Sequence, residues 1–143
     1  MARILIAGCG DVGTVLGQRL HATGHVVWGL KRRPADLPAA IRPLAADLTD
    51  PASLNRLPPE LDFIVYSAAA AGFGEAQYRA AYRDGLKNLL TVLRQTGQRP
   101  RRLLFTASTS VYGQQEGEWV DENSKTETDV DSPNYLLPND ARL

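Results

Sequence analysis

The segment RILIAGCGDVG (residues 3–13) decides the fold of this 143-residue chain. Residues 3–8 are a continuous apolar run that ends in glycine, which is typical of a strand buried on both faces of a sheet. Residues 11–24 then place apolar side chains on one helical stripe and end in glycine, as helices commonly do. The members of that stripe are Val12, Leu16 and Leu20. The chain therefore begins with a buried strand that turns tightly into an amphipathic helix.

Beyond this segment, strand-like and helix-like patterns alternate along the chain. Further strands are predicted at residues 25–30, 41–47, 62–68 and 101–108, and further helices at 50–57 and 75–96. Strands separated by helices imply parallel pairing with right-handed crossovers. We therefore expect an α/β fold, a doubly wound parallel sheet of about five strands in the order 3-2-1-4-5, with ligands at the carboxyl ends of the strands.

Length and composition limit the classes of protein that need to be considered. The length fits one domain over residues 1–143, with 1–112 as its core and 113–143 as a polar loop or tail. Lys and Arg total 16 and so do Asp and Glu, so no overall field favours a nucleic-acid partner. No apolar run approaches the length of a membrane span, and a single cysteine excludes a cysteine-based metal cage. We expect a cytoplasmic protein with no nucleic-acid, membrane or metal partner.

The turn between the first strand and the first helix carries the pattern G-x-G-x-x-G. Its six residues are Gly8, Cys9, Gly10, Asp11, Val12 and Gly13. Gly8 permits a tight turn, Gly10 lets the backbone approach a pyrophosphate, and Gly13 lets the helix pack close to the strand. The helix N-terminus then offers unpaired amides to the phosphates. This placement predicts a Rossmann dinucleotide site; the alternative is a turn whose glycines serve packing alone, and Cys9 is expected to be a buried, unreactive thiol.

The end of the second strand bears on the choice of cofactor. NAD-binding folds usually place Asp or Glu there to hold the adenosine ribose, whereas this strand runs into Lys31, Arg32 and Arg33. Basic side chains pair with a ribose 2′-phosphate that a carboxylate would repel. The sequence therefore favours NADP over NAD, the alternative being an ordinary solvated strand end.

Several motifs together resemble a known family. They are IAGCGDVG (6–13), ADLTD (46–50), YSAAA (66–70), GLKNLL (85–90) and FTASTSVYG (105–113). The chain resembles the extended and atypical short-chain dehydrogenase/reductases, the NAD(P)-dependent epimerase/dehydratase family of nucleotide-sugar enzymes, from residue 3 to about 120. One departure is Ala7, which stands where extended members carry the first glycine of G-x-x-G-x-x-G.

The resemblance implies roles for particular residues. Asp47 and Leu48 would flank the adenine, and the small residues Ser67, Ala68 and Ala69 would lie along the ribose and diphosphate. Ser108 occupies the place of the family's catalytic serine or threonine, where a hydroxyl can bind a substrate oxygen beside the nicotinamide. The neighbours Thr109 and Ser110 could meet the same geometry, and the alternative is that these hydroxyls only cap a turn.

The family's acid is a tyrosine followed four residues later by lysine, which lowers the phenol pKa. None of the three lysines of this chain follows a tyrosine by four. Tyr135 is the nearest candidate for the acid, but position 139 is Asn and Pro138 would break the helix that presents such a pair.

Three functions remain open from the sequence. The first is the NAD(P)-binding domain of an epimerase/dehydratase-type oxidoreductase acting by hydride transfer on a small molecule such as a nucleotide sugar. The second is a non-catalytic NADP(H)-binding sensor or regulatory module that lacks the Tyr/Lys acid. A weaker third is a structural partner that binds nothing.

Family members continue for about as long again with a substrate-binding region that we expect to be absent here. The open edge of strand 101–108 would then be covered by a homo-oligomer contact or by the C-terminal tail.

Overall fold

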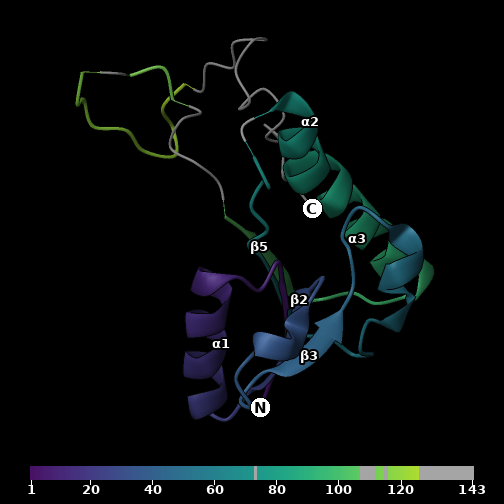
Figure 1. The fold of residues 1–143 in the computed structure, drawn as a ribbon. Helices are drawn as coiled ribbons and strands as arrows, with labels where there is room; N and C mark the ends of the chain where they lie inside the picture. Colours follow the sequence, from purple (N-terminus) through teal and green to yellow (C-terminus); the bar gives the residue numbers. More distant parts are fainter. Residues whose placement is uncertain (73, 107–111, 115, 126–143) are drawn as a thin grey trace.

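The computed structural model describes residues 1–72, 74–106, 112–114 and 116–125 (Figure 1). The strands are β1 (Arg3–Ala7), β2 (Val26–Lys31), β3 (Arg42–Ala45), β4 (Phe63–Tyr66) and β5 (Arg102–Phe105). The helices are α1 (Asp11–Ala22), α2 (Glu75–Tyr78) and α3 (Gly85–Gln95). The 3₁₀ segments η1 (Pro34–Asp36) and η2 (Pro51–Arg56) follow β2 and β3, and the π-helical segment η3 (Arg79–Asp84) joins α2 to α3.

The strands form one parallel sheet in the order β3-β2-β1-β4-β5, which confirms the predicted fold. Leu5, in the middle of β1, is opposite Trp28 of β2 on one side and Ile64 of β4 on the other. A central strand with helices on both faces is apolar where both faces are covered, which explains the apolar run over residues 4–7. The chain builds outward from β1 to β3 and then returns to place β4 beside β1. The order therefore reverses at β1 and β4, where folds of this kind bind ligands.

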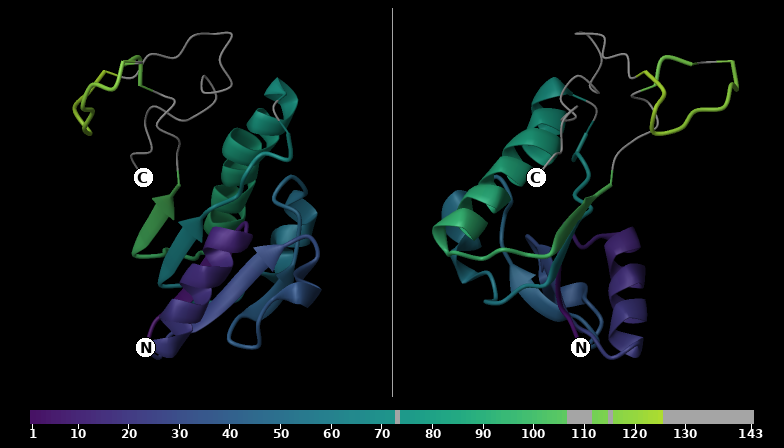
Figure 2. Two further views of the ribbon diagram at one scale, coloured as in Figure 1. Left: turned by 60° about the vertical axis from the view of Figure 1, so that its left-hand side comes forward. Right: turned by 180° about the vertical axis from the view of Figure 1, so that it is seen from behind.

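The two faces of the sheet are covered by different helices, as the right-hand view of Figure 2 shows. Helix α1 packs one face through Leu16 and Leu20, against a cluster made of Ile6, Cys9, Val27, Ile41 and Val65. Helix α3 and η2 cover the other face with a larger cluster. Its sheet members include Leu5, Ile64 and Tyr66, and its helix members include Leu54, Leu86 and Leu89. Burial of these two apolar layers is what holds α1 and β1 in fixed relation.

The helix predicted over residues 75–96 is present but is not uniform. It consists of α2, a wider π-helical turn at η3, and α3. The buried Tyr66 hydroxyl donates to the carbonyl of Ala81 within that turn, and an added Cβ on Gly85 would lie 2.5 Å from the same hydroxyl. A buried phenol needs a hydrogen-bond partner, and a π-turn exposes a carbonyl that a regular α-helix would use itself. The single long helix expected from the spacing is therefore interrupted by a π-helical turn, which provides the hydrogen-bond acceptor for Tyr66.

Two other segments differ from the expected elements. The short helix expected at residues 50–57 is the 3₁₀ segment η2. Its N-cap is Asp50, whose side chain accepts a hydrogen bond from the Ala52 amide at 3.1 Å. The described part of the tail, residues 112–114 and 116–125, contains no helix or strand, and its Trp119 is 99% exposed. In the described part of the chain, no helix is both long and apolar enough to cross a membrane.

Candidate dinucleotide-binding site

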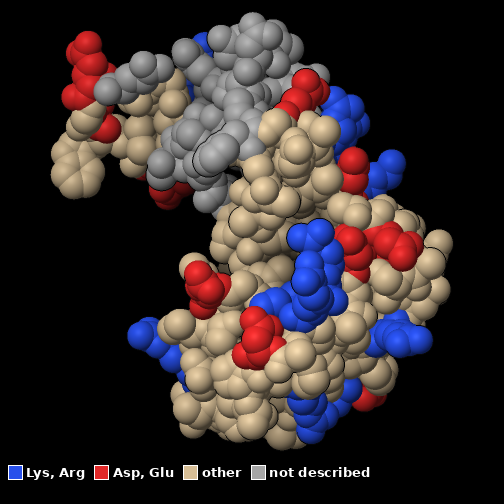
Figure 3. All heavy atoms as spheres, in the orientation of Figure 1, with Lys and Arg blue, Asp and Glu red and all other residues tan. Residues whose placement is uncertain are grey.

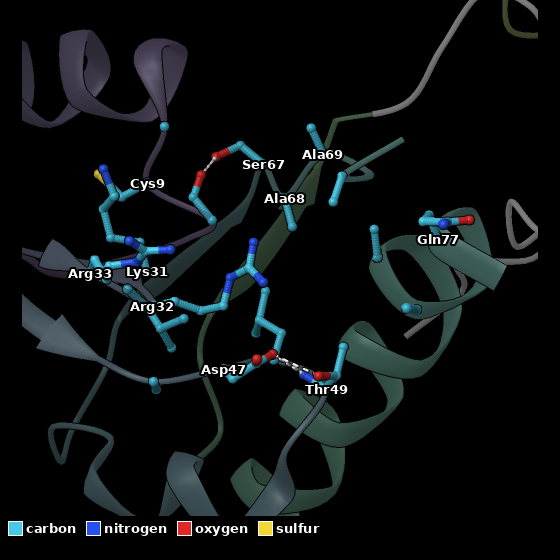
Figure 4. A pocket seen from close by; sticks show the side chains of 18 residues that line it. Cys9, Lys31, Arg32, Arg33, Asp47, Thr49, Ser67, Ala68, Ala69 and Gln77 are labelled. Atoms are coloured by element: carbon cyan, nitrogen blue, oxygen red, sulfur yellow. Dashed lines mark hydrogen bonds between the residues drawn. The ribbon is translucent and has the colours of Figure 1, made fainter. Parts of the chain in front are cut away.

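A cavity of about 510 Å³ lies at the carboxyl edge of the sheet (Figure 4). Its walls come from the turn after β1, the end of β2, the loop after β3, the end of β4, and the α2–η3 helix. The lining residues that the sequence singled out are Gly8, Cys9, Gly10, Lys31, Arg32, Asp47, Leu48, Ser67, Ala68 and Ala69. The fold thus brings together segments that are as much as 73 residues apart in sequence, from Gly8 to Ala81, at the point where the strand order reverses.

The turn after β1 is fixed by hydrogen bonds to both neighbouring strands. The amides of Gly8 and Cys9 donate to the Leu30 carbonyl of β2 at 3.0 and 2.9 Å. The Ser67 hydroxyl, after β4, donates to the Gly8 carbonyl at 3.0 Å. Gly8 has a φ of +83°, and an added Cβ would lie 2.4 Å from backbone atoms of Ala68. Only glycine fits there, because the position needs both the left-handed conformation and the missing side chain.

The start of α1 presents backbone donors without a side-chain cap. Gly10 is the N-cap residue, and an added Cβ there would meet no heavy atom within 4 Å. The first helical bond runs from the Thr14 amide to the Gly10 carbonyl at 2.8 Å. The three amides between them, of residues 11–13, therefore have no acceptor within the helix. Unpaired amides and the positive end of the helix dipole make this position suited to an anion.

The last three motif residues, Asp11, Val12 and Gly13, contribute differently from Gly8 and Gly10. Gly13 faces the sheet, where an added Cβ would lie 2.9 Å from Ile6 Cγ2, so its role is close packing of helix on strand. The side chains of Asp11 and Val12 line a separate shallow apolar groove on α1. Asp11, Val12 and Gly13 do not line the cavity at the sheet edge, so only their backbone amides, at the helix start next to Gly10, are candidates to bind a ligand there.

Cys9 is fully buried within the turn. Burial raises the pKa of its thiol, and a weak contact with the Thr14 hydroxyl at 3.9 Å opposes that shift. A thiol whose pKa is raised is a poor nucleophile at neutral pH. The structure confirms that Cys9 is buried in the turn, and the raised pKa favours the expected lack of reactivity.

Basic side chains gather beside the cavity at the carboxyl end of β2 (Figure 3). Lys31 forms an ion pair with Asp36, with 3.0 Å from its Nζ to each carboxylate oxygen. Arg32 extends into the middle of the cavity toward Ala68 (Figure 4). Within the described part of the chain, no hydrogen bond or ion pair is recorded for the Arg32 guanidinium.

The loop after β3 forms the opposite wall and is held from several sides. Thr49 donates from its hydroxyl at 2.7 Å and its amide at 2.9 Å to one oxygen of Asp47, which lowers the pKa of that carboxyl; the charge of Arg32 adds to the effect. Ser53 accepts from the Asp47 amide and donates to the Asp47 carbonyl, both at 2.9 Å. Asn88 of α3 donates to the Leu48 carbonyl at 2.9 Å. Asp47 therefore stays ionised in a rigid loop. Its second carboxylate oxygen accepts no hydrogen bond from the described residues.

Sequence reasoning missed part of the wall and the support of the site. The far wall also includes Ala71, Gln77, Ala80 and Ala81. Asn88 supports Leu48 from 40 residues away, and its only sequence signal is its place in GLKNLL. Ser108 and Tyr135, the two predicted catalytic residues, lie outside the described residues. Among the residues that the structure describes, no cluster of three His, Cys, Asp or Glu side chains could hold a metal ion.

Comparison with known proteins identifies the class to which this fold and site belong. Residues 4–136 match the NAD-dependent epimerase/dehydratase family, and the chain belongs to that family. A comparison with curated proteins gives no match.

Solved structures share the fold. A protein of Methylobacillus flagellatus described as an NAD-dependent epimerase/dehydratase is 36% identical with a TM-score of 0.75, over 95% of this chain and 47% of that one. A protein of Burkholderia cenocepacia described as an epimerase is 27% identical with a TM-score of 0.78, over 95% and 48%. The UDP-glucose 4-epimerase of Thermus thermophilus, in complex with NAD, is 25% identical with a TM-score of 0.77, over 92% and 46%. The chain spans about half the length of these proteins.

The two glycines of the turn give a matched test of this geometry. Gly8→Ala should lower the free energy of unfolding by about 2 kcal/mol or more, because alanine is disfavoured at positive φ and its Cβ meets the Ala68 backbone. Gly10→Ala adds the same methyl group where space is open, and should cost less than about 1 kcal/mol. Urea unfolding followed by circular dichroism measures both, and equal losses would contradict the description of the turn.

Proposed function

We propose that this chain binds a nicotinamide dinucleotide and is the cofactor-binding half of an epimerase/dehydratase-type oxidoreductase. The observation that carries the proposal is the open position at Gly10, beside helix amides that have no acceptor within α1. A cradle of this kind suits a diphosphate, because backbone and anion can approach without a side chain between them. Membership of the family and the NAD complex of the Thermus thermophilus enzyme support the same proposal.

The residues around the cavity fit the parts of such a cofactor. The amides of residues 11–13 would hold the diphosphate, with Gly8 and Ser67 fixing the turn that presents them. Asp47 would accept from the adenine amino group through its free oxygen, and Leu48 would pack beside the ring. Ala68 and Ala69, at the end of β4, leave room for the ribose and diphosphate to lie along the strand. When bound, the nicotinamide supplies hydride transfer.

We further propose that the protein prefers NADP to NAD. Arg32 reaches into the cavity (Figure 4), and no carboxylate among the described residues is hydrogen-bonded to its guanidinium. A guanidinium can hold a ribose 2′-phosphate in two parallel hydrogen bonds, which a ribose hydroxyl cannot match. The position after β2, where NAD-specific folds place an acid, is basic in this chain.

For the chemistry, we propose that Ser108 orients a substrate oxygen and that Tyr135 is the candidate acid. Ser108 belongs to the motif FTASTSVYG, which begins at the last residue of β5, Phe105, and the carboxyl end of β5 lies at the same sheet edge as the cavity. The substrate class we propose is a nucleotide sugar or a related alcohol or carbonyl compound, since the Thermus thermophilus relative is a UDP-glucose 4-epimerase. Residues 1–112 would form the core of one domain that works in the cytoplasm, with its β5 edge covered by a second copy or by the tail.

One sequence observation favours a second candidate, a non-catalytic NADP(H)-binding sensor or regulatory module. No lysine follows a tyrosine by four residues, so no ammonium is placed to lower a phenol pKa as the family's acid requires. Such a module would keep the cofactor site and lack the chemistry.

Gly10→Ala tests the binding proposal directly. The added methyl group would stand where the diphosphate approaches the backbone, so the Kd of both NADH and NADPH should rise by more than about tenfold, or about 1.4 kcal/mol. Fluorescence titration of the reduced nucleotides measures the effect, with the urea midpoint as a check on folding. Unchanged affinity in a folded variant would exclude this turn as the phosphate site.

Arg32→Asp tests the cofactor preference. The Kd for NADPH should rise by about tenfold or more, because a charge-assisted hydrogen bond to phosphate is worth roughly 1.5–3 kcal/mol and a repulsive carboxylate replaces it. The Kd for NADH should change by less than about threefold. Arg99→Asp is the matched control, since Arg99 is exposed before the amino end of β5, at the opposite edge of the sheet. Equal effects on the two nucleotides would remove the 2′-phosphate assignment.

Turnover distinguishes the enzyme from the sensor. We expect a panel of nucleotide sugars and aldehydes to show cofactor-dependent turnover that Ser108→Ala lowers by about 10²-fold, the range for loss of a hydrogen bond to a developing charge. Binding of NADPH should be retained in that variant. Full activity of Ser108→Ala would refute the catalytic assignment, and binding without any turnover would favour the sensor.

A further inference from the structure

The ion pair between Lys31 and Asp36 is built by the short turn that follows β2. Lys31 is the last residue of β2, and η1 (Pro34–Asp36) folds the chain back so that Asp36 faces it. The Leu37 amide closes that turn on the Pro34 carbonyl at 3.1 Å. Both oxygens of Asp36 accept from the Lys31 ammonium at 3.0 Å. The Asp36 carboxylate therefore neutralises the positive charge of Lys31 at the edge of the cavity.

This pairing divides the basic residues of the cavity into two kinds. The cavity is lined by Lys31, Arg32 and Arg33. Of these three, only Lys31 forms an ion pair with another residue that the structure describes. The Lys31 side chain is 28% exposed and that of Asp36 is 71% exposed, so the carboxylate is the more solvent-exposed partner of the pair. Asp36 does not line the cavity itself. Among the three basic residues that line the cavity, Lys31 is the one that Asp36 contacts.

We propose that Asp36 is a specificity-determining residue that withholds Lys31 from the ribose 2′-phosphate and so limits the preference for NADP over NAD. This inference rests on the proposed cofactor function. A 2′-phosphate can recruit Lys31 only in competition with a carboxylate that already occupies two of its three donors. Arg32 is then the main residue that distinguishes NADP from NAD. The affinity for NAD does not depend on the Lys31–Asp36 pair, because NAD has no phosphate at this position.

The expected size follows from the exposure of the pair. Ion pairs exposed to solvent are weak and screened by salt, so release of Lys31 should change affinity by a small factor and not by orders of magnitude. A released ammonium within reach of a dianionic phosphate strengthens binding most at low ionic strength. The effect should therefore be confined to the phosphorylated cofactor and should shrink as salt is added.

The test compares wild type with Asp36→Asn by fluorescence titration of NADPH and NADH at low salt. We expect the Kd for NADPH to fall by about two- to fivefold and that for NADH to change by less than about 1.5-fold. Glu60→Gln is the control, because it removes the same charge at an exposed site just before β4, at the amino edge of the sheet. Asp36→Ser serves as a second variant should the asparagine perturb η1. A NADPH affinity that is unchanged, or that rises equally in Glu60→Gln, would overturn the inference.

A double-mutant cycle with Lys31→Gln isolates the route of the effect. In the Lys31→Gln background, Asp36→Asn should no longer improve NADPH binding, because there is no ammonium left to release. A gain of the same size in that background would mean that Asp36 repels the phosphate directly, and would refute the role assigned to Lys31. The outcomes also separate this inference from the proposed function. Wild type that binds neither nucleotide would refute the function, whereas wild type that binds both with no response to Asp36→Asn would refute the inference alone.

Discussion

The structure depends on one constraint, the left-handed turn at Gly8. Its φ of +83° turns the chain from the central strand into α1 within a few residues. The turn is held from both sides, by the Leu30 carbonyl of β2 and by the Ser67 hydroxyl after β4. Since β2 and β4 flank β1, these bonds hold the turn at the point where the strand order reverses. They also fix the start of α1, whose first amides have no acceptor within the helix.

The remaining walls are rigid for reasons of their own. Asp47 is held by Thr49 and Ser53 within its loop, and Asn88 connects that loop to α3. On the far side, Tyr66 stacks on Phe105 with ring centroids 5.4 Å apart, and its hydroxyl fixes the π-turn that contributes to the wall. A cavity whose walls are fixed before the ligand arrives costs little conformational entropy on binding. This arrangement suits a cofactor that must be oriented as well as held.

Local patterns allowed the sequence to predict the parallel sheet, its strand order and the residues of the turn. An apolar run, a glycine motif and a helical stripe each report on contiguous residues, and their order determines the topology. Two of the missed features need partners that are distant in sequence, and the third depends on the geometry of a short turn. Asn88 bonds Leu48 across 40 residues, Tyr66 disturbs a helix 15 residues later, and Asp36 reaches Lys31 only because η1 has 3₁₀ geometry. Ser108 and Tyr135 remain predictions, since they lie outside the described residues.

The central claim is that the backbone at the start of α1 holds a dinucleotide diphosphate. Amide chemical shifts of the ¹⁵N-labelled protein, followed while NADPH is added, test it most directly. We expect the amide signals of Asp11, Val12 and Gly13 to shift the most and to saturate together, and ADP-ribose to produce the same pattern. Unshifted signals at these three residues while the nucleotide is bound would refute a diphosphate site at the start of α1.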